Sequence, residues 1–348
     1  MKKTVLASLL FLVCFYSIAQ TKLLTIEDAL VNNRSSLAVK NLRQAQFIYG
    51  TDDLVYLDSK DGKDVWVKKR GASFLSLEDL NAKLKVASLE EVKAMPAIQF
   101  NKSAEWMMTV GGSRIALNSA TGKARVVVDK TIAGKEHVEE STGGLVAYVD
   151  KFNLFVTDGK GAKQVTTDGS ENIVYASSVH REEFGISKGT FWSNDGKGLA
   201  FYRMDQSMVT DYPIIDWTQR PAKAVNIKYP MAGDKSHHVT VGIYNAVTGK
   251  LVYLQTGEPK EQYLTNIAWS PDSKYVFVAI VNREQNQMKL NQYDAATGGF
   301  IKTLFEEKDE KYVEPLVPMQ FVPNKPNEFL WQSNRDGWNH VYLYDVTG

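Results

Sequence analysis

Phe191-Trp192-Ser193-Asn194-Asp195-Gly196-Lys197 returns later in the chain as Ala268-Trp269-Ser270-Pro271-Asp272-Ser273-Lys274, and a weaker echo follows at 321–324. The two tryptophans, at positions 192 and 269, are 77 positions apart, which fits two repeats of roughly 40 residues each. A repeat of this length in strand-rich sequence is typical of a β-propeller, in which four-stranded blades surround an axis. One blade cannot cover both of its faces, so neighbouring blades bury each other. The sequence therefore predicts an all-β fold.

A second pattern runs between these markers. A short alternating run rich in Val, Ile, Tyr and Phe is followed by a Gly, Asp or Asn turn, which predicts a β-hairpin. The turns lie at 61–62, 121–123, 158–160, 248–250, 297–298 and 347–348. Counted from Ala45, the repeats predict roughly six or seven blades. Because the chain stops in the turn of a hairpin, we expect the propeller at 45–348 to be incomplete.

Helical signal is scarce. Residues 25–30 and 76–84 each carry an N-cap residue ahead of an apolar run, and residues 88–93 are similar. We expect short helical inserts at these places and no helical domain.

The composition excludes several classes of function. The 348 residues carry 41 Lys and Arg against 40 Asp and Glu, a net charge of +1, so neither nucleic acid nor an acidic membrane surface is a favoured partner. Hydrophobic residues make up 44 % of the chain, which predicts a large folded core.

The N-terminus has the pattern of a secretory signal. Lys2 and Lys3 precede an apolar run from Val5 to Tyr16 that is too short to span a bilayer, and Ser17-Ile18-Ala19 offers a cleavage site. We expect a signal peptide at 1–19, an N-terminal segment at 20–44, and export to the periplasm or the cell surface without a membrane span. The one cysteine, Cys14, lies inside the signal, so the mature chain has no disulfide.

Glu182 and Glu183 are the main candidate site residues. Two adjacent carboxylates repel each other unless a nearby cation compensates their charge, and the α-ammonium group of a peptide is such a cation. One interpretation is therefore an amine-recognition pair on a short helical insert. The other is a solvated surface pair balanced by Arg181 and Lys188.

A long polar and aromatic excursion follows, from Asp205 to Lys235. It either lines a substrate tunnel, docks a partner domain, or is a structural loop with an ion pair between Arg203 and Asp205. The neighbours His237 and His238 do not predict a metal site, because adjacent strand residues point to opposite faces.

We expect no catalytic residue, metal or cofactor in this chain. No serine nucleophile elbow with His and Asp partners, no phosphate-binding loop and no dinucleotide fingerprint is expected from its residues. The chain is not predicted to be a hydrolase on its own.

From about residue 173 onward the chain resembles the N-terminal propeller of the prolyl dipeptidyl and tripeptidyl peptidases, the dipeptidyl peptidase IV-like serine peptidases. Prolyl tripeptidyl peptidases are the most similar branch. The resemblance rests on 179–185, which holds the two acids, and on 201–209, 229–233, 237–244, 254–260 and 335–340.

The resemblance implies an eight-bladed propeller followed by an α/β-hydrolase domain, which is missing here, and cleavage of short peptides after proline. It implies that Glu183, with Glu182 beside it, binds the free N-terminus of the substrate. It also implies that a homodimer is possible. Dipeptidyl members carry an Arg-His-Ser-Tyr segment that the region 106–120 lacks, Arg114 being no clear substitute, so tripeptide release is favoured. The alternative function is a non-enzymatic propeller that binds peptides or a partner.

Overall fold

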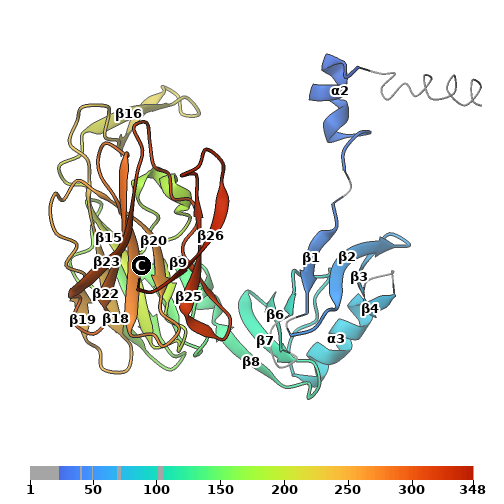
Figure 1. Ribbon diagram of the computed structural model, residues 1–348. Helices are drawn as coiled ribbons and strands as arrows, with labels where there is room; N and C mark the ends of the chain where they lie inside the picture. Colours follow the sequence, from blue (N-terminus) through green and yellow to red (C-terminus); the bar gives the residue numbers. More distant parts are fainter. Residues whose placement is uncertain (1–22, 40, 49, 69–71, 101–104, 348) are drawn as a thin grey trace, which may run out of the picture. The chain divides into compact units, whose positions relative to one another are not determined.

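The computed structural model describes residues 23–347 except 40, 49, 69–71 and 101–104, and it divides into two compact units, Met1–Leu80 and Asn81–Gly348. The signal peptide predicted at 1–19 lies outside the described residues. Antiparallel sheets of largely consecutive strands are the main regular structure of both units, as the colours of Figure 1 follow from blue to red. The all-β prediction is confirmed. In the part of the chain that the structure describes, no helix has the length and apolar character needed to cross a bilayer.

The unit Met1–Leu80 contains one sheet, in the order β1-β2-β3-β4. Strands β2 and β3 are joined by the predicted turn, where Asp61 and Gly62 have φ of 51° and 75°. Positive φ at both central residues is what a two-residue hairpin of the favoured hand requires. The elements are α2 (Ile26–Leu30), η1 (Asn32–Arg34), β1 (Arg43–Phe47), β2 (Leu54–Lys60), β3 (Lys63–Lys68) and β4 (Ser73–Leu75).

Two of the three expected helices form. Helix α2 begins at a capping box in which Thr25 and Asp28 bind each other's backbone N–H groups. Helix α3 (Leu77–Val86) begins after Ser76, whose hydroxyl oxygen accepts the N–H of Asp79 at 3.0 Å. The helix predicted at 88–93 is wrong. Helix α3 is followed by a turn in which Ser88 has φ of 57°, and the segment beyond it is irregular because the Asn81 side chain binds the backbone of Val92.

The unit Asn81–Gly348 contains five sheets of blade type in chain order, the last of three strands. Together with the sheet of the first unit, the described residues thus form six blades, within the predicted number. The strands are β5 (Gln99–Phe100), β6 (Glu105–Val110), β7 (Ser113–Asn118), β8 (Ala124–Val128); β9 (Glu136–Glu140), β10 (Val146–Asp150), β11 (Asn153–Thr157), β12 (Ala162–Gln164); β13 (Ile173–Tyr175), β14 (Thr190–Trp192), β15 (Gly198–Asp205), β18 (His238–Asn245), β19 (Leu251–Tyr253); β20 (Tyr263–Trp269), β21 (Tyr275–Val281), β22 (Gln287–Asp294), β23 (Phe300–Lys308); and β24 (Gln320–Val322), β25 (Lys325–Ser333), β26 (His340–Asp345). A short helix, α4 (Lys130–Ala133), precedes β9.

From the sheet of β9–β12 onward, successive blades of this unit pack face to face. One buried cluster joins the sheet of β10 and β11 to the sheet of β15. A second joins that sheet to the sheet of β20–β23, and a third continues from there to β25. The repeated tryptophans reinforce the stack, because the Trp192 indole N–H donates to the carbonyl of Glu139 and the Trp269 indole N–H to the carbonyl of Phe191.

The spacing of the two Trp-Ser markers corrects one expectation. Trp192 lies in β14 and Trp269 in β20, which belong to successive blades, so the interval spans one blade and not two. The blade is long because the excursion between β15 and β18 folds into an extra hairpin, β16 (Asp211–Asp216) and β17 (Lys223–Lys228). Figure 1 shows this hairpin projecting from the sheets of its unit. Several of its apolar side chains are exposed, among them Trp217 at 81 %.

Candidate functional site

Glu182 and Glu183 lie in η3 (His180–Gly185), which we call the acid turn. The expected helix is wrong in detail: the hydrogen bonds are of the 3-10 type, but the backbone is largely left-handed. The angle φ is 54° at His180, 58° at Arg181 and 66° at Glu182, whereas Glu183 is extended, with φ −63° and ψ 165°. Each non-glycine residue in the left-handed region costs on the order of 1–3 kcal/mol, and such residues cluster at functional sites.

Apolar anchors hold the strained backbone on both sides. Val179 and Ile186, which flank the acid turn, are buried in the cluster between the sheet of β15 and the sheet of β20. Inside the turn, Phe184 is 4 % exposed and its ring centroid lies 5.1 Å from that of Tyr263. Burial of these side chains offsets the cost of the left-handed residues between them.

Gly185 closes the acid turn at φ +71°. A Cβ at this position would lie 2.2 Å from the carbonyl oxygen of Leu316, nearer than any real Cβ contact. Glycine is therefore required here both for the backbone angle and for the close approach.

The two carboxylates are exposed and have different neutral donors. The Ser178 hydroxyl donates to Glu182 Oε1 at 3.1 Å, within the same blade. The Gln285 amide donates to Glu183 Oε2 at 3.3 Å, from the turn between β21 and β22 of the next blade. The two acids thus use separate supports.

The cations expected to balance these acids have other partners. The Arg181 guanidinium lies 4.8 Å from the centre of the Tyr229 ring, and Lys188 forms an ion pair with Glu139. Within the described part of the chain, no ion pair involves either acid of the turn. The acids are thus exposed, as a solvated surface pair requires, but neither forms an ion pair with Arg181 or Lys188.

A buried histidine pair ties the acid turn to its surroundings. The backbone N–H of Leu264 donates to His180 Nε2 at 3.0 Å, so the neutral ring carries its proton on Nδ1 and donates it to His237 Nε2, also at 3.0 Å. Burial lowers the pKa of His180 well below its ordinary value and that of His237 to about 4. Both rings are therefore neutral near pH 7. His237 is thus engaged with His180, while His238 is the first residue of β18.

A cavity of about 340 Å³ adjoins Glu182. Its lining includes Arg181, Met204, Gln206 and Lys228, the last in an ion pair with Asp211 at 3.0 Å. This volume lies at the lower end of the range of small-molecule sites. It is sufficient for a small part of a bound peptide next to the acid turn.

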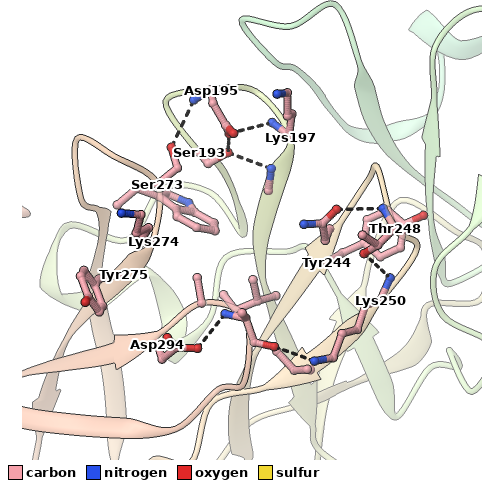
Figure 2. Close-up of a pocket in the computed structure, with 17 residues that line it drawn as sticks. Ser193, Asp195, Lys197, Tyr244, Thr248, Lys250, Ser273, Lys274, Tyr275 and Asp294 are labelled. Atoms are coloured by element: carbon pink, nitrogen blue, oxygen red, sulfur yellow. Dashed lines mark hydrogen bonds between the residues drawn. The ribbon is translucent and has the colours of Figure 1, made fainter.

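A larger cavity, of about 470 Å³, lies among the turns of the two Trp-Ser markers (Figure 2). Its polar groups bind one another: the Ser193 hydroxyl donates to Asp195 at 2.6 Å, and Lys250 donates to the carbonyl of Ala296 at 2.8 Å. The backbone N–H of Asp195 also reaches the Ser273 hydroxyl of the next marker. We assign this cavity and the markers a role in packing the blades.

The Arg203–Asp205 ion pair, one of the alternatives for this excursion, does not form. Arg203 is paired in register with Tyr175 of β13, and its guanidinium reaches Asp168 at 2.9 Å, while Asp205 accepts the hydroxyl of Ser207. The hydroxyl of the cross-strand partner Tyr175 accepts Arg203 Nε at 3.1 Å and itself donates to Asp168, so the guanidinium is directed toward Asp168.

Arg114 lies in the region where dipeptidyl members carry the Arg-His-Ser-Tyr segment. It forms an ion pair with Glu140 at 2.8 Å. Its charge is therefore already engaged.

The letters of the Gly-x-Ser-x-Gly elbow do occur once, at 185–189, contrary to the expectation from the sequence. An elbow needs its serine at a sharp turn from a strand into a helix. Ser187 instead lies in the irregular segment between the acid turn and strand β14. The match does not make a nucleophile.

Comparison with known proteins agrees with this architecture. Residues 135–348 match the family model described as "Dipeptidyl peptidase IV (DPP IV) N-terminal region". A "Probable dipeptidyl-aminopeptidase B" of Penicillium rubens is 26 % identical over 282 residues, 74 % of this chain and 30 % of that protein. The protein of the same description from Phaeosphaeria nodorum is 31 % identical over 228 residues, 56 % of this chain and 25 % of that protein.

Two solved structures share the fold. A "putative dipeptidyl aminopeptidase IV" from Bacteroides ovatus is 39 % identical, with a TM-score of 0.78, and the match covers 94 % of this chain and 46 % of that one. Dipeptidyl peptidase 4 of Porphyromonas gingivalis, at 19 % identity, has a TM-score of 0.68 over 94 % of this chain and 48 % of that one. The chain thus spans less than half the length of these relatives. From the family match and the stacked blades, the chain belongs to the dipeptidyl peptidase IV N-terminal family, and its blades form a propeller region of the kind that this family shares.

Proposed function

We propose that the acid turn binds the α-ammonium group of short peptides, with Glu183 as the main anchor and Glu182 beside it. In this proposal the propeller admits short peptides, excludes long chains, and presents the N-terminus at a fixed distance from a catalytic centre. The protein is exported and releases di- or tripeptides after proline. A serine-type α/β-hydrolase domain, beyond the residues of this chain, performs the cleavage.

The supporting observation is the state of the two carboxylates. They are exposed, they receive hydrogen bonds from neutral donors, and the nearby cations of the turn are directed to other partners. Two adjacent negative charges favour a bound cation. Since the backbone that carries them is left-handed and anchored in the core, the pair is held in place before a ligand arrives, which reduces the entropy lost on binding.

The chemical contribution of such a site is positioning. A charge-assisted contact from an ammonium group to a carboxylate is about twice as strong as a neutral hydrogen bond. It selects peptides with a free N-terminus, and it fixes the number of residues between that terminus and the scissile bond. Correct placement of a reacting group is worth many orders of magnitude in rate.

Calorimetry of the chain with a short Xaa-Pro peptide tests the proposal. We expect the free-amine peptide to bind and its N-acetylated counterpart to bind at least tenfold more weakly. E183Q, which keeps the shape and removes the charge, is expected to weaken binding of the free-amine peptide by about tenfold or more. The matched control is E171Q, an exposed acid in the same blade. Equal binding of both peptides, or equal effects of E183Q and E171Q, would show that the acid turn is not the anchor.

The length of the released peptide is a separate question. The relatives described as dipeptidyl aminopeptidases favour dipeptide release, while the missing Arg-His-Ser-Tyr segment favours tripeptides. Mass analysis of the products that this propeller, joined to the proposed hydrolase domain, releases from a peptide with proline at both positions two and three separates the two.

A second candidate function is partner binding, for which the β16–β17 hairpin is the supporting observation. Its exposed Ile215 and Trp217 form an apolar surface in the described part of the chain. We propose that this hairpin contributes to a homodimer. Sedimentation of W217S against the unmodified chain tests it: the variant is expected to dissociate, and an unchanged sedimentation coefficient would exclude the hairpin.

A further inference from the structure

Three polar side chains of the next blade form a hydrogen-bonded group that reaches Glu183 through Gln285. Gln285 lies in the turn between β21 and β22, Tyr263 is the first residue of β20, and Arg283 follows the end of β21. The Gln285 amide nitrogen contacts both Glu183 Oε2, at 3.3 Å, and the Tyr263 hydroxyl, at 3.2 Å. Arg283 Nη1 contacts the same hydroxyl at 2.5 Å.

The hydrogen-bond directions in this group follow from Glu183. A carboxylate accepts, so the Gln285 atom facing it is the amide nitrogen, which has two hydrogens. One hydrogen goes to Glu183 and the other to the Tyr263 oxygen. Arg283 only donates, so it occupies the second lone pair of that oxygen.

The Tyr263 hydroxyl is therefore left with its own proton. A phenol has two acceptor positions and one donor, and both acceptor positions are filled. Among the described residues, no acceptor for this proton lies within hydrogen-bonding distance. A ligand atom that accepts a hydrogen bond can therefore take this proton without displacing a partner within the protein.

The tyrosine is held rigidly. Tyr263 is 7 % exposed. Its ring centroid lies 5.0 Å from that of His180 and 5.1 Å from that of Phe184, both in the acid turn. Gln285 is fixed as well, with φ of 59° and its carbonyl accepting the N–H of Val313 at 2.7 Å. The hydroxyl direction is thus set by the same packing that sets the acid turn.

We propose that Tyr263 determines specificity by donating its hydroxyl to the first carbonyl oxygen of a peptide whose amine is bound at Glu183. Gln285 and Arg283 are positioning residues that orient this hydroxyl. The spacing is suitable, because one amide nitrogen bridges Glu183 and Tyr263, and an α-amine and the carbonyl of the same residue are separated by about one residue length, roughly 3.5 Å. The inference rests on the proposed function, since it needs the amine at Glu183.

The test uses a ligand pair that differs in one atom group. The probes are a short free-amine Xaa-Pro peptide and its trans-alkene isostere, in which the first peptide bond lacks the carbonyl oxygen but gains no charge. We expect the unmodified chain to bind the peptide about tenfold more tightly than the isostere. In Y263F, which keeps the ring and its packing, the peptide is expected to bind about tenfold more weakly, and the two probes are expected to bind alike.

Two further variants complete the cycle. Q285A is expected to reduce the preference for the carbonyl severalfold, because it frees one lone pair of the tyrosine oxygen and releases its orientation. The matched control is Q287A, a glutamine on β22 that donates to Glu306 at 2.9 Å, away from the acid turn. It is expected to leave the preference unchanged. Thermal melting of each variant identifies any loss of fold.

The outcomes separate the two proposals. If free-amine and N-acetylated peptides bind equally to the unmodified chain, the amine site itself is wrong. If the amine preference is present but Y263F retains the tenfold preference for the carbonyl, Tyr263 is not the donor and this inference is overturned. Loss of that preference in Y263F, with Q287A unaffected, supports it.

Discussion

Replacement of Gly185 by alanine is the sharpest test of how the acid turn is held. Two effects operate at this position. The backbone has φ +71°, a conformation that an L-residue adopts at a cost of about 1–2 kcal/mol. The new Cβ would also lie 2.2 Å from the carbonyl oxygen of Leu316, so the backbone of one segment has to move.

The magnitude follows from adding these effects. Forcing an extra methyl into a packed site costs typically about 1–3 kcal/mol. We therefore expect G185A to lower the free energy of unfolding by about 2–5 kcal/mol, a large part of the roughly 5–15 kcal/mol of a typical domain. Each kcal/mol corresponds to about 2–4 °C in a domain of this size, so the melting temperature is expected to fall by about 4–20 °C.

A matched glycine separates the clash from the backbone cost. Gly257 has φ +78°, but a Cβ there would meet nothing within 4 Å. G257A is expected to lose about 1–2 kcal/mol, the backbone cost alone. The assay is thermal and chemical denaturation of both variants, with calorimetry of a free-amine peptide. G185A is expected to weaken peptide binding and G257A is not. Equal shifts in melting temperature would refute the argument that Leu316 limits the acid turn.

Two further predictions concern the surroundings of the acid turn. Burial is the main reason that the pKa of His237 is lowered to about 4. As the pH falls below the ordinary pKa of 6.5, the unfolded chain therefore takes up a proton at this residue while the folded chain does not. The contribution of neutral His237 to the free energy of unfolding is fully present above pH 6.5 and falls by up to about 3 kcal/mol as the pH drops to about 4. Denaturant midpoints measured across this pH range are expected to show a shallower slope in H237Q, and an unchanged slope would exclude His237 as a source. The buried Tyr202 hydroxyl donates to the carbonyl of Leu264 at 2.9 Å and so joins two blades. Y202F is expected to lower the free energy of unfolding by about 1–2 kcal/mol in the same titration. No loss would mean that this carbonyl finds another donor.

Much of the fold was predictable from local sequence. Alternating runs with Gly, Asp and Asn turns identified the hairpins, because a turn such as 61–62 specifies its own backbone. The capping residues Thr25 and Ser76 identified two helices for the same reason. The helix expected at 88–93 failed because the segment is held by the side chain of Asn81, a contact that its own sequence does not reveal.

For the candidate site too, some features followed from the sequence and others only from the tertiary structure. The sequence by itself determined the all-β blades, the repeated Trp-Ser markers and the presence of two adjacent acids, since these depend on periodicity and local composition. Only the tertiary structure decided that the acid turn is left-handed, that one blade and not two separates the markers, and that Gln285, 102 positions along the chain, donates to Glu183. Such contacts depend on how neighbouring blades pack, and packing joins residues whose separation in sequence carries no signal.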